Sequence, residues 1–410
     1  MKTFNNKLAD YAKIIVKLGL NLRKNDILYI SAKIDNVDLV RLVTKEAYNL
    51  DVKEVIVSFY DDQINLMKYQ NADDDVFESY PEWEKLKFEA LAEKDASFLH
   101  ISSNNPQLLK DIDPKRVANY SKVSNIALEK YRDRVIQSYN RWCIVAASSE
   151  GWAKKVFPNL SSEDAIEKLW DKIFSIVRVD LDRPIKAWEN HNNTLQDKVK
   201  FLNNMNFKEL HYKSDKTNLI VGLPKGHIWE GGGEDDKKGI FFVPNMPTEE
   251  VFSMPDKHNI NGILHSTMPL SYGGTLIDNF SFEFKDGKII DFKAKTGYET
   301  LKRLLETDNG AKYLGEVALV PVDSPISNSG TIFYNTLYDE NASCHFALGA
   351  AYKSCIQNGN DMSDKELDEN GVNTSLVHVD FMVGSSNLNI NGVTYDNKVI
   401  PIFKNGNWIK

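Results

Sequence analysis

The C-terminal half of the chain carries histidine and carboxylate side chains in apolar surroundings, where they could bind metal ions. His378 and Asp380 are separated by one residue in the otherwise apolar run 376–383. Because side chains alternate between the two faces of a β-strand, this imidazole and carboxylate are expected on the same face. A buried charge is costly unless it is paired or bound to metal. The pattern therefore indicates either a metal site or a hydrogen-bonded His–Asp pair on a half-exposed face.

Two acidic positions precede this run. Glu316 is the one charged residue in the apolar run 314–320, and Glu250 follows a proline-containing turn directly before apolar residues. Taken singly, Glu316 is also explained as a strand-end carboxylate that reaches solvent. Glu250 is also explained as an acid at a helix N-terminus, where the helix dipole favours it. Neither carboxylate alone predicts a metal site, and the prediction depends on the whole set of residues.

The segment 342–352 is rich in small residues and predicts a helix. His345 and Tyr352 are seven residues apart, so after two helical turns they are expected on the same side. Glu340 precedes His345 by five residues and is expected in the turn that enters this helix. A single histidine on such a helix is more often a core residue than a ligand, so His345 also depends on its neighbours.

Together these positions supply three carboxylates and two imidazoles: Glu250, Glu316, His345, His378 and Asp380. Such a set suits zinc, manganese or cobalt and is poorly suited to copper(I). Three carboxylates offset three of the four positive charges of two divalent ions, and a hydroxide would offset the fourth. The set therefore predicts a two-metal hydrolase, in which the ions activate a water molecule and polarise the scissile carbonyl.

The sequence resembles the thermophilic-type metallo-aminopeptidases, the family of aminopeptidase T and aminopeptidase S, over nearly its whole length. The resemblance rests on the segments 141–146 and 151–158 in the N-terminal half and on the long run 333–345. It implies a peptide-cleaving enzyme with two divalent ions, in which the five residues above are the ligands. It further implies that Glu316 bridges the ions, that Tyr352 lies beside them, and that the protein is a homodimer. The stretch 147–150 departs from the family pattern, which puts subunit or substrate contacts in doubt more than the chemistry.

Hydrolysis by a metal-activated water suggests roles for three further residues in catalysis. Tyr352 could donate a hydrogen bond to the tetrahedral oxyanion, and Glu340 or Glu249 could carry the proton. The free amine of the substrate would coordinate a metal or meet an acid, which would explain cleavage from the N-terminus. Two alternatives remain: another dimetal amide or ester hydrolase, and a non-enzymatic protein that binds peptides or metal.

The elements that must position these residues divide the chain. Strand patterns at 27–30, 55–57, 98–101 and 143–146 alternate with helical patterns, which predicts an α/β domain with a mostly parallel sheet. A helical region over 162–202 is broken by Pro184. Short strands then follow, with turn signals at Asp286-Gly287 and Asn391-Gly392. We expect an α/β domain over 1–205 and a β-rich α+β metal-binding domain over 206–410.

Composition and motifs exclude several classes. The net charge of -8 argues against a nucleic-acid partner, and three cysteines cannot form a disulfide framework. The apolar stretch 14–22 is broken by polar residues, and no run is long enough for a membrane span, so a soluble, cytoplasmic protein is expected. The sequence has no His-Glu-x-x-His, no Gly-x-Ser-x-Gly and no Gly-x-Gly-x-x-Gly after its first strand.

Overall fold

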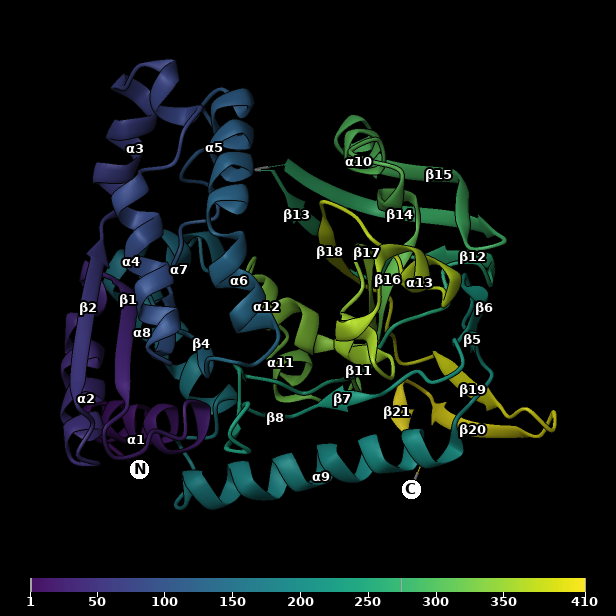
Figure 1. Ribbon diagram of the computed structural model, residues 1–410, viewed down its shortest axis with the longest axis horizontal. Helices are drawn as coiled ribbons and strands as arrows, with labels where there is room; N and C mark the ends of the chain where they lie inside the picture. Colours follow the sequence, from purple (N-terminus) through teal and green to yellow (C-terminus); the bar gives the residue numbers. More distant parts are fainter. Residues whose placement is uncertain (1, 274, 410) are drawn as a thin grey trace. The chain divides into compact units, whose positions relative to one another are not determined.

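The computed structural model describes residues 2–273 and 275–409 (Figure 1). The chain forms two compact units. The first contains Met1–Asn190 and Gly233–Pro247, and the second contains His191–Gly232 and Thr248–Lys410. A domain boundary near residue 205 stays a prediction. The compact units do not divide the chain at a single point, because the second unit begins at His191 and the chain returns to the first unit at Gly233.

The first unit is built on a five-stranded parallel sheet in the order β10-β4-β3-β1-β2. Its strands are β1 (Ile27–Lys33), β2 (Glu54–Tyr60), β3 (Ser97–Ser102), β4 (Trp142–Ala146) and β10 (Asn245–Met246). The first four contain the four predicted strand segments, so the α/β prediction is confirmed. The distant residues Asn245 and Met246 pair with Ile144 and Val145, which places the returning segment in this unit.

Helices connect the parallel strands, as the alternating pattern predicts. They are α1 (Phe4–Ile14), α2 (Val37–Tyr48), α3 (Asp62–Asn71), α4 (Glu82–Glu93), α5 (Pro114–Ala127), α6 (Glu129–Ile136), α7 (Glu150–Val156) and α8 (Ser162–Ile176). The unit also contains the short pair β8 (Glu234–Asp235) and β9 (Phe241–Phe242). The helix α9 (Pro184–Met205) begins at Pro184. Proline is tolerated at the start of a helix, because the first backbone N–H groups have no acceptor within the helix. No helix among the described residues is long and apolar enough to cross a membrane.

The second unit contains two antiparallel sheets, which confirms a β-rich α+β fold for this part of the chain. The larger sheet contains β5 (Glu209–Lys213), β6 (Asn218–Gly222), β12 (Ile260–His265), β13 (Leu270–Tyr272), β14 (Thr275–Lys285), β15 (Lys288–Thr296), β19 (Asn389–Val393), β20 (Val399–Lys404) and β21 (Asn407–Trp408). The smaller sheet, which we call the site sheet, has the order β18-β17-β16-β11-β7. Its strands are β7 (Glu230–Gly231), β11 (Val251–Ser253), β16 (Leu314–Leu319), β17 (His345–Gly349) and β18 (His378–Met382). Short helices complete the unit: α10 (Tyr298–Leu305), α11 (Pro325–Asn328), α12 (Thr336–Asp339) and α13 (Asp364–Glu369).

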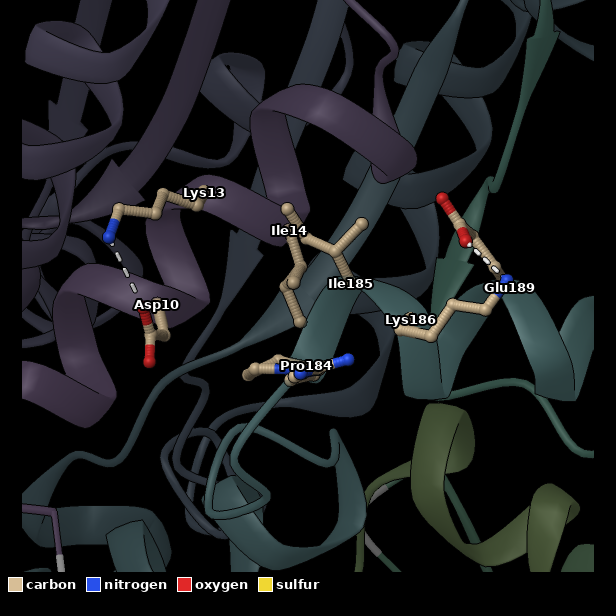
Figure 2. Close-up of a pocket in the computed structure, with 8 residues that line it drawn as sticks. Asp10, Lys13, Ile14, Pro184, Ile185, Lys186 and Glu189 are labelled. Carbon is tan, nitrogen blue, oxygen red and sulfur yellow. Dashed lines mark hydrogen bonds and ion pairs between the residues drawn. The ribbon is translucent and has the colours of Figure 1, made fainter.

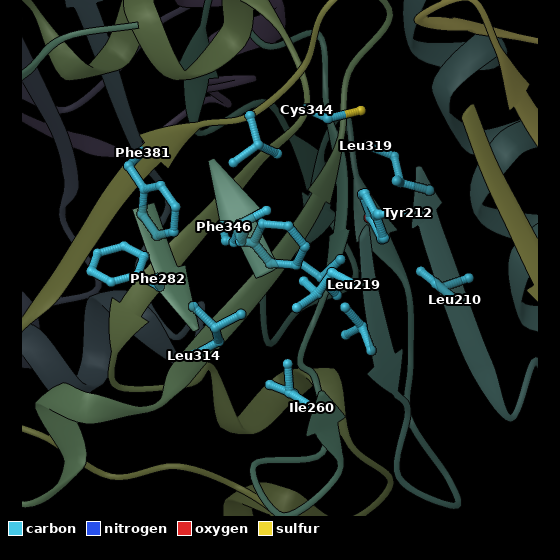
Figure 3. Close-up of a cluster of buried hydrophobic side chains, with 14 of the residues drawn as sticks. Leu210, Tyr212, Leu219, Ile260, Phe282, Leu314, Leu319, Cys344, Phe346 and Phe381 are labelled. Atoms are coloured by element: carbon cyan, nitrogen blue, oxygen red, sulfur yellow. The ribbon is translucent and has the colours of Figure 1, made fainter. Parts of the chain in front are cut away.

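The two sheets of this unit pack against each other through buried aliphatic and aromatic side chains (Figure 3). Tyr212 of the larger sheet contacts Phe346 of the site sheet, with ring centroids 5.1 Å apart. Phe282 and Phe381 form a second contact of this kind at 5.3 Å. The apolar core therefore covers one face of the site sheet and leaves the other face for polar side chains.

The prediction of a helix over 342–352 is wrong, because His345–Gly349 forms the strand β17. The small residues of this segment allow close approach of neighbouring backbones. Gly349 has a φ of +100°, and a Cβ there would collide with the carbonyl oxygen of Val377. β17 pairs with both β16 and β18, and this tertiary pairing outweighs the local composition. Tyr352 therefore does not share a helix face with His345.

One of the two predicted turns is confirmed and the other is wrong. Asp286 and Gly287 both have positive φ and connect β14 to β15, as the Asp-Gly signal indicates. Asn391 and Gly392 instead lie inside β19, and the chain turns between Thr394 and Lys398. A Cβ at Gly392 would collide with the ring of Phe207, so this glycine serves close packing.

Candidate metal centre

The face of the site sheet opposite the core carries all five predicted ligands. In its register Ala318 faces His345, Ala347 faces both Glu316 and Asp380, and Gly349 faces His378. Directly paired residues of neighbouring strands point to the same face of a sheet. The intervening residues of these strands point the other way and belong to the apolar core, among them Val317, Leu319, Phe346, Leu348 and Phe381.

A β-bulge in β16 decides where Glu316 points. Leu314 is paired with Leu348, but two residues later Glu316 is paired with Ala347, so the register shifts between them. Without this shift Leu314 and Glu316 would share one face. The bulge lets Leu314 enter the core while Glu316 joins the ligand face.

Glu250 reaches the same face from the neighbouring strand. It precedes β11 by one residue and stands two residues before Phe252, whose partner Ala318 is paired with His345. The preceding residue, Glu249, donates its backbone N–H to the side-chain oxygen of Asn341 at 2.7 Å. Glu250 is therefore held at one end of the row of ligands.

The five side chains form two overlapping groups. The ligand atoms of Glu250, Glu316 and His345 lie within 4.8 Å of one another, and so do those of Glu316, His378 and Asp380. His345 Nε2 lies 3.1 Å from a Glu250 oxygen and 3.6 Å from Glu316 Oε1. His378 Nε2 lies 3.1 Å from Glu316 Oε2 and 3.4 Å from Asp380 Oδ1. Glu316 thus presents one oxygen to each group.

Hydrogen bonds on the far side of each imidazole orient the two histidines. His378 donates from Nδ1 to the carbonyl oxygen of Ala350 at 2.7 Å. His345 Nδ1 lies 3.3 Å from the carbonyl oxygen of Ser343. A carbonyl can only accept, so Nδ1 carries a proton. With no cation bound, Nε2 donates to the carboxylates that face it, and it would offer its lone pair to a bound cation. Metal-binding histidines commonly have this arrangement.

Burial and mutual charge set the electrostatics of the cluster. Burial alone would raise the pKa of Glu316, but hydrogen bonds from His345 and His378 outweigh burial and lower it to about 2. Burial raises the pKa of Glu250, and the His345 contact offsets only part of this rise. Asp380 Oδ1 is buried and accepts no hydrogen bond from the described residues. Oxygen and imidazole ligands around such an orphaned atom fit a divalent metal ion.

Glu340 and Tyr352 lie beside the two groups. Glu340 opens a short 3-10 turn, Glu340–Ala342, and burial together with the charges of Asp380 and Glu250 raises its pKa well above the ordinary value. The Tyr352 ring lies 5.0 Å from the His378 ring, and the residue as a whole is 37% exposed. Burial and then the charges of Glu316 and Asp380 raise the Tyr352 pKa, so the phenol stays protonated and can donate.

Sequence reasoning did not single out Asn341. This fully buried side chain accepts the Glu249 N–H and donates to the carbonyl oxygen of Leu337 at 3.0 Å. It therefore ties the segment that carries Glu250 to the segment that carries Glu340. The one feature of the sequence that could have pointed to Asn341 is its position directly after Glu340.

A hollow of about 290 Å³ in the first unit contains none of the predicted site residues (Figure 2). Ile14, Pro184 and Ile185 form its apolar lining. The charged residues around it include two ion pairs, Asp10–Lys13 at 3.3 Å and Lys186–Glu189 at 3.1 Å.

Known proteins resemble the chain over its whole length. Residues 4–408 match the thermophilic metalloprotease (M29) family. Aminopeptidase AmpS of Bacillus subtilis is 48% identical over 408 residues, covering 100% of both chains. Aminopeptidase PepS of Streptococcus thermophilus is 42% identical, covering 100% of this chain and 99% of the relative. The solved structure of wild-type AmpT from Thermus thermophilus superimposes with a TM-score of 0.94 at 36% identity, with 100% of both chains covered.

The fold and the relatives together define a metallopeptidase, and its candidate metal ligands lie on one face of an antiparallel sheet. The chain belongs to the thermophilic metalloprotease (M29) family. It is a metallo-aminopeptidase, so its activity depends on a divalent metal. The predicted family and enzyme class are confirmed.

Proposed function

We propose that two divalent ions, of zinc, cobalt or manganese, bind to the site sheet and that the chain removes N-terminal residues from peptides with them. Glu250 and His345 would hold one ion, His378 and Asp380 the other, and Glu316 both. The observation that carries this proposal is the position of Glu316, with one oxygen in each ligand group. When bound, the pair of ions would activate a water molecule and polarise the scissile carbonyl.

The remaining residues would support the reaction from the protein side. Tyr352 keeps its proton and would donate a hydrogen bond to the oxyanion. Glu340 would accept a proton from the attacking water and return it to the leaving amine, because it lies beside Asp380 and Glu250 and bound cations would favour its ionised form. Ala350 and Ser343 would keep the imidazoles oriented through their carbonyl oxygens.

Three wider statements belong to the same proposal. The chain would act in the cytoplasm, as a homodimer, with an α/β domain over 1–205 and a catalytic domain over 206–410. The resemblance to the family and the sequence pattern support them. Light scattering of the purified chain tests the dimer, and a mass of 46.7 kDa in solution would contradict it.

Hydrolysis of an unblocked peptide by metal-stripped and metal-restored enzyme tests the function. We expect no activity after chelation and recovery with zinc, cobalt or manganese. The N-acetylated form of the same peptide should be a poor substrate, because capture of the free amine would restrict cleavage to the N-terminus. Equal cleavage of both forms, or cleavage at internal bonds, would favour another dimetal amide or ester hydrolase.

A further inference from the structure

Glu230 lies on the same face of the site sheet as the metal ligands. In β7 it is paired with Phe252, which is paired with Ala318, which is paired with His345. Directly paired residues share a face, so Glu230 and His345 belong to the same row of side chains, which continues to Met382. Diagonal neighbours on adjacent strands are about 7–8 Å apart, and Glu230 stands in this relation to Glu250.

The carboxylate of Glu230 has hydrogen-bond donors but no cation. Ser354 Oγ donates to Glu230 Oε2 at 2.9 Å, and the Cys355 thiol approaches the same oxygen at 3.9 Å. Among the described residues no Lys, Arg or His nitrogen lies within 4.0 Å of it. Oε1 accepts no hydrogen bond from the described residues, and it is not among the side-chain atoms that are fully buried without a partner, so it keeps some access to solvent. Burial raises the pKa of this carboxyl group, which shows that its negative charge is poorly compensated.

Two aromatic rings connect Glu230 to the candidate metal centre. The Phe252 ring lies 5.8 Å from the Tyr352 ring, and the Tyr352 ring lies 5.0 Å from the His378 ring. Both aromatic residues are partly exposed. An apolar wall that begins at a ligand and ends at an uncompensated acid suits an apolar stem with a positive end, and the rings themselves attract cations.

The distance from Glu230 to the ligand set decides whether the α-amine or a basic side chain of the substrate could reach this carboxylate. Three strand spacings of about 4.8 Å lie between Glu230 and His345, so the carboxylate stands well away from the centre of the ligand set. The α-amine of a substrate is only two bonds of about 1.5 Å from the reacting carbonyl carbon and cannot reach that far. A long side chain on the same residue can.

We propose that Glu230, Phe252 and Tyr352 form a subsite for a lysine or arginine side chain at the N-terminal residue of the substrate. This proposal rests on the proposed function, because it assumes that the scissile carbonyl binds at the site sheet. The subsite makes the chain selective for positively charged N-terminal residues over neutral residues of the same shape.

The p-nitroanilides of arginine, citrulline and leucine test the subsite with the metal-loaded full chain. Citrulline has the shape of arginine without its charge. A charged hydrogen bond corresponds to about 10–100-fold in kcat/KM, so wild type should prefer arginine to citrulline by such a factor, mainly through KM. Glu230→Gln keeps an acceptor for Ser354 and removes the charge, so the ratio should fall to about 1. The matched control, Glu283→Gln, changes an exposed glutamate of β14 and should keep the wild-type ratio.

Each remaining outcome decides between this proposal and others. Equal use of arginine and citrulline by wild type would overturn the subsite, and this comparison stands even if Glu230→Gln fails to fold. An arginine preference that survives in Glu230→Gln would also overturn it. A uniform loss of kcat on all three substrates would show that Glu230 acts through the Ser354 turn on Tyr352 instead. Failure of wild type to release leucine at all would contradict the proposed function itself.

Discussion

Glu316 stands between two imidazoles, and its two carboxylate oxygens approach different histidines. This division of one side chain between two ligand groups is the residue-scale basis of the proposed two-ion site. The neighbouring carboxylates Glu250 and Asp380 each complete one group. Four buried or partly buried acids, with Glu340 the fourth, make the face strongly attractive to divalent cations.

Tyr352→Phe should lower kcat by about 10²–10³-fold while leaving the metal content unchanged, because one oxyanion donor is typically worth that factor. The phenylalanine ring can keep the contacts with Phe252 and His378. Steady-state kinetics and metal analysis of the same preparation measure both quantities. An unchanged kcat would reduce Tyr352 to a packing residue.

Asn341→Ala should destabilise the fold by about 1–3 kcal/mol and weaken metal binding, because it leaves the buried N–H of Glu249 without its partner. Urea unfolding and cobalt titration measure these effects. Asn193→Ala, which changes an exposed asparagine of α9, is the matched control and should alter neither. If Asn341→Ala bound cobalt as tightly as wild type, Asn341 would have no role in positioning Glu250.

Four of the five candidate ligands were predicted as polar side chains in apolar strands or turns, and His345 was predicted on a helix with support from the family resemblance. The structure brings all five together. Their mutual arrangement could not be found in this way. The orientation of Glu316 depends on the bulge, and Asn341 reaches the segment that carries Glu250 through a contact with a residue 92 positions away. Such long-range contacts leave no periodic pattern in the sequence.

At the scale of elements, the strands of the first unit were predictable because parallel strands alternate with helices. β17 was not, because the alanine residues in and around it suggest a helix when the neighbouring strands are unknown. The small residues instead let β16 and β18 approach on either side, as the close contact of Gly349 with Val377 shows. Tertiary pairing overrides local propensity at such positions.

Gly349→Ala should destabilise the chain more than Gly330→Ala. Both glycines have positive φ, +100° and +62°, but a Cβ at Gly330 meets no atom within 4 Å. Positive φ alone costs about 1–2 kcal/mol for a residue with a Cβ. The collision with Val377 should add about 1–3 kcal/mol and displace the adjacent His378. Urea unfolding compares the two variants, and equal destabilisation would contradict the close approach of β17 and β18.

At the scale of the whole molecule, Glu250 and Glu340 oppose folding at neutral pH when no cation is bound, because the pKa of each is raised in the folded chain. A ligand that binds only the folded state adds stability by mass action, about 2.7 kcal/mol at a concentration of 100 times its Kd. Chelation should therefore lower the Tm, and zinc or cobalt should restore it in a concentration-dependent way. Differential scanning calorimetry measures the shift. A Tm unaffected by chelator and metal would contradict a metal site in the folded chain.

The metal content of Glu316→Gln tests the central claim most directly. If two ions bind about 3.5–4 Å apart, as in other two-metal sites, this replacement would remove the charge that offsets their repulsion and would disturb both ligand groups. His345→Ala and His378→Ala each disturb mainly one group, and circular dichroism should show all three variants folded. After dialysis, mass spectrometry should find less than one tightly held ion per chain in Glu316→Gln and about one in either histidine variant. Two ions retained by Glu316→Gln would contradict a shared ligand at this position.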